Sequence, residues 1–314
     1  MNDVCQILGT KYPIIQGAMA RIAESALAAA VSNGGGLGII ASGGYDAEWL
    51  RNEIKKVREL TDKPFGVNLM LLMPNIDELV TVVCEEKVPV VTTGAGNPGK
   101  YMKSLKEAGV KVIPVVASVA LAVRVERAGA DAVIAEGTEA GGHIGEITTM
   151  ALTPQVADAV SIPVIAAGGI ADGRGIAAAY MLGAKGVQVG TRFVVAKECI
   201  VSQNYKDAIL KAKDTDTCAT GRITGHPVRV IKNKLAREIL AIEKSCNGED
   251  AQAAIDKVGI GALSAAVFDG DVERGSVMSG QIAGIVNREQ PAAEMIAEIF
   301  EEAKKIYADR VSLF

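Results

Sequence analysis

Short apolar runs recur along the first 195 residues, and each is followed by a segment with helical periodicity. They lie about 20–30 residues apart, and most are apolar throughout, which is typical of parallel strands covered on both faces. The eight runs are Pro13–Ile15, Gly38–Ile40, Phe65–Val67, Val88–Val91, Val112–Val116, Ala132–Ile134, Val164–Ala166 and Val187–Val189. This repetition predicts an α/β fold, a (β/α)₈ TIM barrel.

Helix boundary signals agree with this assignment. Ser118–Ala128 has apolar residues at helical spacing, and Thr153 followed by Pro154 has the form of an N-cap and a first helical residue. The glycine-rich stretch Gly34–Gly38 suggests the dinucleotide fingerprint of a doubly wound sheet. However, it follows a helix and precedes a strand, the reverse of the required order, so we interpret it as a tight turn. Glycines also end helices before strands at Gly109, Gly129 and Gly183.

The strand rhythm stops near Phe193, and this sets the predicted domain boundaries. Residues 1–195 are expected to form the barrel and to bind the cofactor. Residues 196–290 are more charged and show no strand pattern, so we expect an appended, mostly helical subdomain. Pro291 opens a last amphipathic helix, and we expect residues 291–314 to pack on the barrel.

Composition excludes several classes of function. The net charge of −4 provides no basic field for nucleic acid. The five cysteines are scattered and there are only two histidines, so no metal site is expected, and reduced thiols in a cytoplasmic protein are favoured. No signal peptide precedes the first strand, and the longest apolar stretches are strand-sized, which argues against a membrane span.

Glycines follow the seventh and eighth predicted strands, where barrels commonly bind phosphate. Gly168, Gly169, Gly190 and Thr191 would let backbone N–H groups approach phosphate oxygens. The alternative is that these glycines only make tight turns.

Three amides, Gln16, Asn68 and Gln188, interrupt otherwise apolar strands. Buried amides need hydrogen-bond partners, and a flavin ring offers several, with Met19 positioned to pack on its face. Alternatively, each amide satisfies backbone groups at the barrel rim. His143 follows the sixth strand in a glycine-rich loop and is the candidate proton carrier, unless it is simply an exposed loop residue. His226 is interpreted as structural.

Motifs spread over nearly the whole chain resemble the superfamily of nitronate monooxygenases and FabK-type enoyl-acyl-carrier-protein reductases, and the FabK branch most of all. The matching segments are Ile15–Met19, Lys63–Asn68, Thr92–Gly96, Glu139–His143, Ala166–Ile170, Gln188–Phe193, Gly225–Arg229 and Gly275–Gln281. The resemblance implies FMN at the barrel mouth, with His143 catalytic. It implies cofactor contacts at Gly17, Ala18, Met19, Asn68, Thr92, Glu136, Ala140, Gly141, Gly142, Gly168, Gly169, Gln188, Gly190 and Thr191.

The implied reaction is reduction of a trans-2-enoyl thioester on acyl carrier protein, with NADH or NADPH as reductant and with a monovalent cation and a homodimer left open. Nitronate oxidation by O₂ is the main alternative; a flavin-binding module without turnover and a flavin-free sugar-phosphate barrel are two others.

Arg21 departs from the branch, which usually has an aromatic residue there, and is expected to change the substrate channel. Arg222–Arg237 contains five Lys or Arg residues and no acidic residue, and it predicts a partly helical docking face for the acidic carrier protein. The alternative is a solvated helix face, or arginines that hold the subdomain to the barrel.

Overall fold

Eight parallel strands form a barrel in the computed structural model, which describes residues 3–246 and 248–310. The strands are β1 (Ile14–Gln16), β2 (Gly38–Ala41), β3 (Phe65–Met70), β4 (Val90–Gly94), β5 (Lys111–Val116), β6 (Val133–Glu136), β8 (Val164–Ala167) and β9 (Gly186–Val189). They are hydrogen-bonded in the order β1-β9-β8-β6-β5-β4-β3-β2, and a parallel bridge between Ile15 and Leu37 joins the two ends. The predicted (β/α)₈ fold is confirmed.

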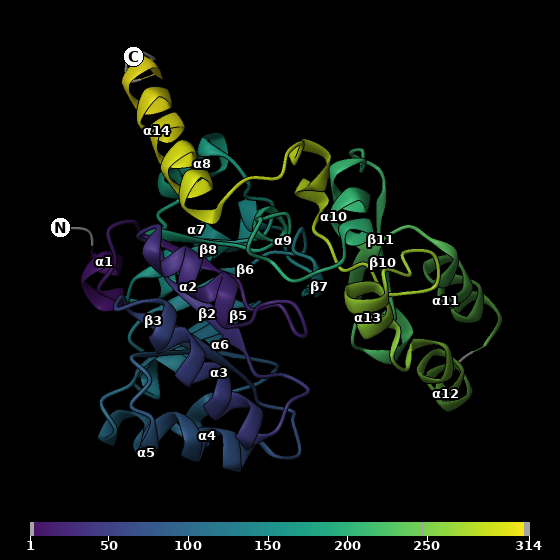
Figure 1. Cartoon of the computed structure of the whole chain (residues 1–314), viewed down its shortest axis with the longest axis horizontal. Coiled ribbons are helices and arrows are strands. Elements are labelled where there is room, and N and C mark those ends of the chain that lie inside the picture. The colour runs from purple at the N-terminus through teal and green to yellow at the C-terminus, as the bar shows by residue number, and fades with distance from the viewer. Residues whose placement is uncertain (1–2, 247, 311–314) are drawn as a thin grey trace.

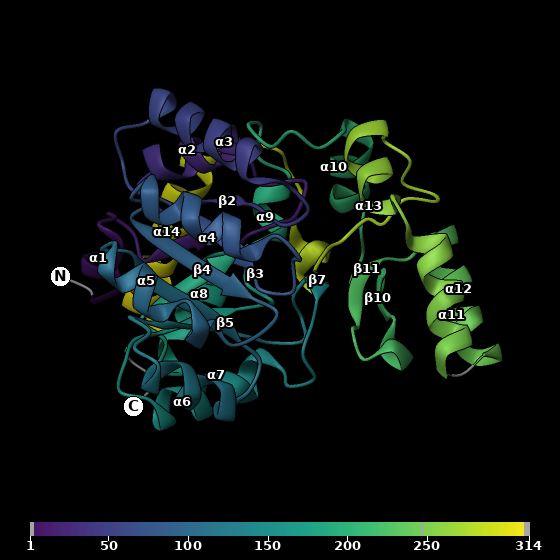
Figure 2. The ribbon, with the colours of Figure 1, turned by 90° about the horizontal axis from the view of Figure 1, so that it is seen from below.

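Helices surround the barrel (Figures 1 and 2). They are α1 (Asp3–Leu8), α2 (Ser25–Asn33), α3 (Ala47–Leu60), α4 (Ile76–Glu85), η1 (Pro98–Lys100), α5 (Met102–Glu107), α6 (Val119–Arg127), α7 (Thr149–Ala159), α8 (Gly173–Met181) and α9 (Thr191–Val194). Ser118, where the predicted helix Ser118–Ala128 starts, is the N-cap of α6, because its side chain accepts a hydrogen bond from the Leu121 N–H.

The predicted start of α7 at Thr153 is wrong. The helix begins at Thr149, and Pro154 lies inside it. The Glu139 carboxylate accepts hydrogen bonds from the Thr149 backbone N–H, at 2.9 and 3.0 Å, and from the Thr149 hydroxyl. A side chain ten residues away therefore satisfies the first turn, and this long-range cap outweighs the local Thr-Pro signal.

The C-terminal helix α14 (Ala292–Arg310) packs against α2 and α8 and completes the ring of barrel helices (Figure 1). The packing is close: a Cβ added to Gly34, at the end of α2, would lie 2.8 Å from the Ala293 Cα. At the other neighbour, the Gly173 N–H donates to the Glu302 carboxylate at 2.8 Å. These contacts require α14 to sit in the position of an eighth barrel helix.

The barrel interior is filled with apolar side chains from alternate strand positions, including Ile15, Ile39, Ile113, Ile134 and Ile165. Val4 and Leu8 of α1 belong to the same buried cluster and close the N-terminal end of the barrel. The opposite end, where the strands finish, therefore remains available for a ligand.

Residues 196–290 form a layer beside the barrel's open end (Figures 1 and 2). Its elements are α10 (Gln203–Leu210), β10 (Thr217–Thr220), η2 (Arg222–Thr224), β11 (Val228–Ile231), α11 (Lys234–Ser245), α12 (Gly248–Gly259), α13 (Ala262–Ser264), the π-turn η3 (Ala265–Asp269) and η4 (Gln281–Ile285). The strands β10 and β11 lie in this region although its sequence shows no strand pattern. β11 pairs with both β10 and β7 (Gly142–His143), so short strands are stabilised by partners that sequence pattern does not reveal.

One continuous helical stretch, Gly248–Asp269, is apolar and long enough to cross a bilayer on length and composition alone. Within this stretch α12 ends at Gly259, and after a turn at residues 260–261 the backbone continues through α13 into η3. Of its most apolar window, 22% is buried. The side chains of this stretch that turn inward contact α11 and the cavity described below.

Candidate active site

A cavity of about 1290 Å³ lies between the carboxyl ends of the barrel strands and the appended layer. The barrel contributes the loops after all eight of its strands. The appended layer contributes β11, α11, α12, α13 and the segment 276–282. Of the fourteen cofactor contacts expected from the sequence, thirteen line this cavity, as does His143. The exception is Thr92.

The glycine loops after β8 and β9 face the cavity with unpaired backbone donors. Gly168 and Gly169 have φ angles of 95° and 72°, in the left-handed region that favours glycine. Within residues 3–246 and 248–310, the N–H groups of Gly168, Gly169 and Gly190 donate no hydrogen bond to protein. Amides that converge without protein acceptors can bind the oxygens of a phosphate group.

A third backbone segment closes the cavity against these loops. The Thr191 hydroxyl accepts a hydrogen bond from the Gly280 N–H at 2.9 Å, which ties the end of β9 to the segment after α13. A Cβ on Gly141 would lie 2.7 Å from the Gly280 nitrogen, so glycine is required there by the close approach of two backbones. Beside them, the buried hydroxyl of Ser279 has no hydrogen-bond partner among the described residues.

The three strand amides have different environments. Gln16 is fully buried; its Oε1 accepts from the Ile39 N–H at 3.0 Å and its Nε2 donates to the Gly17 carbonyl. For Gln16 the structure therefore favours the alternative, in which backbone groups at the barrel rim satisfy the amide.

Asn68 lines the cavity and donates from Nδ2 to the Thr92 hydroxyl at 3.0 Å. Thr92 is buried behind it and orients the amide without facing the cavity. Gln188 is 7% exposed at the cavity wall, and its amide makes no hydrogen bond to any part of the chain that the structure describes. An amide so placed needs a partner in the cavity.

Glu136, at the end of β6, also faces the cavity without a hydrogen bond from the described residues. Burial raises the pKa of this carboxyl to about 7. A carboxyl group near neutrality can donate or accept, according to its protonation, and so matches either a donor or an acceptor on a ligand.

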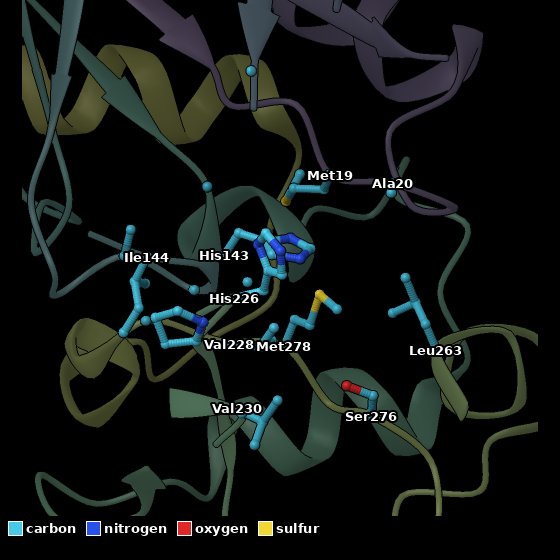
Figure 3. A pocket seen from close by; sticks show the side chains of 18 of the residues that line it. Met19, Ala20, His143, Ile144, His226, Val228, Val230, Leu263, Ser276 and Met278 are labelled. Carbon is cyan, nitrogen blue, oxygen red and sulfur yellow. The ribbon is translucent and has the colours of Figure 1, made fainter. Parts of the chain in front are cut away.

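His143 and His226 meet at the centre of the cavity, where Figure 3 shows them close together between Met19 and Met278. Pairing of β7 with β11 explains this, since Val228 lies opposite His143 and places the preceding loop beside it. Burial, and secondarily the charge of His226, lower the pKa of His143. The lowered pKa favours the neutral form of His143, which has one N–H donor and one acceptor.

His226 was interpreted as structural, and its side chain lines the cavity beside His143. The sequence signal that would have identified it is its position just before a strand able to pair with the loop of His143. Such long-range antiparallel pairing leaves no local pattern.

Arg21 turns away from the cavity. Its guanidinium lies 4.3 Å from the centre of the Tyr45 ring and donates to the Gly44 carbonyl at 2.8 Å, and the Tyr45 ring stacks on Trp49. Arg21 is not among the cavity-lining residues, although Ala20 and Ile22 on either side are. The side chain of Arg21 thus lies outside the cavity and joins the loops after β1 and β2, and its effect on the substrate channel stays a prediction.

The basic segment Arg222–Arg237 does not form one helical face. Arg229 lies in β11, is 6% exposed and donates to the Thr138 carbonyl at 3.0 Å. Arg222 and Lys234 form ion pairs with Glu146 and Glu273. Strand geometry and acidic residues distant in sequence thus divide the predicted patch, and its exposed cations are partly neutralised.

Among the residues that the structure describes, no cluster of three His, Cys, Asp or Glu side chains could hold a metal ion, and the five cysteines form no disulfide with one another. The site therefore consists of backbone donors, two amides, a near-neutral carboxyl group and two imidazoles around an apolar cavity. Such a site suits a phosphate-bearing organic cofactor together with an organic substrate.

The nitronate monooxygenase family model matches residues 2–79 and 74–302. A probable nitronate monooxygenase of Staphylococcus aureus (strain MSSA476) is 35% identical over 97% of this chain and 98% of its own. A further probable nitronate monooxygenase, from Staphylococcus saprophyticus, is 40% identical over 75% of this chain and 80% of its own.

Solved structures point to two named activities. FabK from Thermotoga maritima is 52% identical, with a TM-score of 0.95 over 98% of both chains. A nitroalkane oxidase from Streptomyces ansochromogenes is 29% identical, with a TM-score of 0.86 over 98% of this chain and 99% of its own.

Proposed function

We propose that this chain, which belongs to the nitronate monooxygenase family, is an FMN-dependent enoyl-acyl-carrier-protein reductase. The premise is that the chain is an oxidoreductase of the superfamily that includes FabK. The observation that carries the proposal is the 52% identity to FabK of Thermotoga maritima over 98% of the chain. The cavity supports it, because its volume of about 1290 Å³ exceeds the roughly 300–1,000 Å³ of a pocket for one drug-sized ligand. A cofactor and a substrate can share it.

The residues present fit FMN. The unpaired N–H groups of Gly168, Gly169 and Gly190 would hold its phosphate, and no dinucleotide fingerprint exists for an adenine half. The amides of Asn68 and Gln188 would bind the polar edge of the ring, and Met19 would pack on its face. When bound, FMN would supply hydride transfer from NADH or NADPH to the β-carbon of a trans-2-enoyl thioester.

His143 would act on the thioester oxygen and on the α-carbon, and not on the β-carbon that receives the hydride. Negative charge develops on the thioester oxygen as the β-carbon is reduced, and a positioned donor stabilises that charge. The neutral imidazole of His143 presents one N–H for this purpose and lies in the cavity wall. A proton must then reach the α-carbon, and His143 is the candidate group that delivers it.

The similarity to FabK also suggests the partner and the compartment of the proposed reaction. The carrier protein would deliver the thioester to the cavity, and we place the reaction in a cytoplasmic compartment. A monovalent cation and a homodimer stay predictions.

Two measurements test the proposed function. Purified protein should be yellow and should release FMN, not FAD, on chromatography after denaturation. NADH or NADPH should then be oxidised only when crotonyl thioester is added under anaerobic conditions. Release of FAD or of no flavin would refute the cofactor, and thioester-independent oxidation alone would refute the reductase.

Nitronate oxidation is the second candidate, and the names of the staphylococcal relatives and of the Streptomyces structure favour it. In that reaction the neutral His143 would remove a proton from the substrate or position it, and O₂ would be the final oxidant. Oxygen uptake with an alkyl nitronate, compared with thioester reduction on the same preparation, separates the two activities.

A further inference from the structure

Beyond the two histidines, the cavity continues into the appended layer, and there its walls become apolar. Figure 3 shows the progression from Met19, past the histidines and Met278, to Val230. We define the apolar arm by five side chains of β11, α11, α12 and α13 that line this part of the cavity: Val230, Leu235, Ile239, Ile255 and Leu263.

The helices around the apolar arm are incompletely packed. Leu235, Ile239 and Ala262 form a small buried cluster of their own, against which Ile255 and Val258 pack only partly buried. In α12, Ala251 is the one buried residue among those whose side chains are described. Helices in a finished core bury a continuous apolar stripe, so this cluster has room for a further apolar group.

The helix α12 depends on the appended layer for support. Its main contacts are with α11, α13 and η2, and Gly261 follows it with a φ of 73°. Gln252 and Asp256 of α12 also line this part of the cavity, where their side chains hydrogen-bond to each other at 2.7 Å. The five side chains that define the arm are all apolar. An apolar occupant without charge is the one that these walls would favour.

We propose that the apolar arm binds the distal acyl chain of the substrate and sets the enzyme's preference for chain length. The proposal rests on the proposed enoyl reductase function and names the part of the substrate that α11–α13 recognise. His143 stands at the inner end of the arm, so a thioester held beside it would direct its hydrocarbon tail along Val230 and Leu263. Chains of four carbons would leave the arm unfilled.

The test compares trans-2-butenoyl and trans-2-dodecenoyl coenzyme A with the FMN-loaded enzyme. Each pair of added methylenes that enters the arm should raise kcat/KM by up to about tenfold. Leu263→Trp would fill the arm, and Ile255→Phe would narrow it from the other wall. Each should lower the ratio of long-chain to short-chain kcat/KM at least tenfold.

Phe268→Trp is the matched control, because Phe268 is 50% exposed in the same apolar stretch and is not among the cavity-lining residues. It should keep the wild-type ratio. Flavin content and melting temperature check the fold of each variant, and the Ile255→Phe variant stands in if Leu263→Trp fails to fold.

Three results would overturn the proposal, and they are distinguishable. Equal kcat/KM for both chain lengths in the wild type would refute the assignment of the arm to the acyl chain, but the proposed reductase function would stand. A variant effect confined to the KM for NADH or NADPH would assign the arm to the reductant. Absence of activity on either thioester would refute the reductase function and, with it, the arm.

Discussion

Replacing Gly190 with alanine tests the phosphate site without disturbing the fold. Its φ of −109° is accessible to any L-residue, so the backbone carries no strain. A Cβ at this position would meet only the Met19 sulfur, at 3.9 Å, which is ordinary van der Waals contact. The added methyl group therefore enters the cavity beside an unpaired N–H.

The expected loss is one charge-assisted hydrogen bond to phosphate, roughly 1.5–3 kcal/mol. That energy corresponds to a rise of about ten- to hundredfold in the Kd for FMN. The apoprotein should melt within about 2 °C of the wild type, because a Gly-to-Ala change at a compatible φ is neutral or slightly stabilising.

Titration of apoprotein into FMN, followed by quenching of flavin fluorescence, measures the Kd directly. Gly259→Ala is the control, since a Cβ there meets nothing within 4 Å and the residue lies on α12. An unchanged Kd in Gly190→Ala would refute the phosphate assignment. A large fall in apoprotein melting temperature would instead show that glycine serves packing.

Four further outcomes follow from the same geometry. Gly168→Ala should destabilise the apoprotein itself by several degrees in a melting experiment, because its φ is 95° and a Cβ would lie 2.9 Å from the Gly137 carbonyl oxygen. His143→Ala should retain flavin, seen in its spectrum, but lose about 10²–10⁴-fold of enoyl reduction; unchanged turnover would remove it from the mechanism. The pKa of Glu136 is raised to about 7 from 4.5, so the folded apoprotein binds the extra proton and its stability should fall as pH rises from about 4.5 to 7. Glu136→Gln should flatten that part of a denaturant-derived stability profile, and an identical slope would contradict the assignment. Charge reversal at Lys232 and Lys234 should raise KM for acyl-carrier-protein substrate more than for a coenzyme A thioester, and equal changes would exclude docking there.

The barrel could be predicted because its signal is periodic and local. Continuous apolar runs and glycine helix ends repeat along residues 1–195, and each is decided by neighbours in sequence. The errors arise where a residue distant in the sequence determines the local secondary structure. Glu139 sets the start of α7, and β7 provides the partner that turns residues 228–231 into a strand.

The amides illustrate the same limit within the site. Gln16 and Gln188 present one signal, a polar residue in an apolar strand. Of the two, Gln188 faces the cavity, and its side chain has no partner among the described residues. The bridge between β1 and the chain before β2 places the Ile39 N–H where Gln16 can reach it. Strand register around a closed barrel is not encoded in the composition of either strand.

The position of α14 has a consequence for synthesis of the chain. The groove between α2 and α8 is covered by a helix that begins only at residue 292, after the whole appended layer has been made. A ribosome-bound chain ending near residue 290 thus contains all eight barrel strands but exposes the apolar surface that Met295, Ile296 and Ile299 later bury. Domains generally fold from the N-terminus as they emerge, but this barrel cannot be completed until its last helix leaves the exit tunnel. Nascent chains stalled before α14 should therefore be the species that chaperones bind and proteases cut.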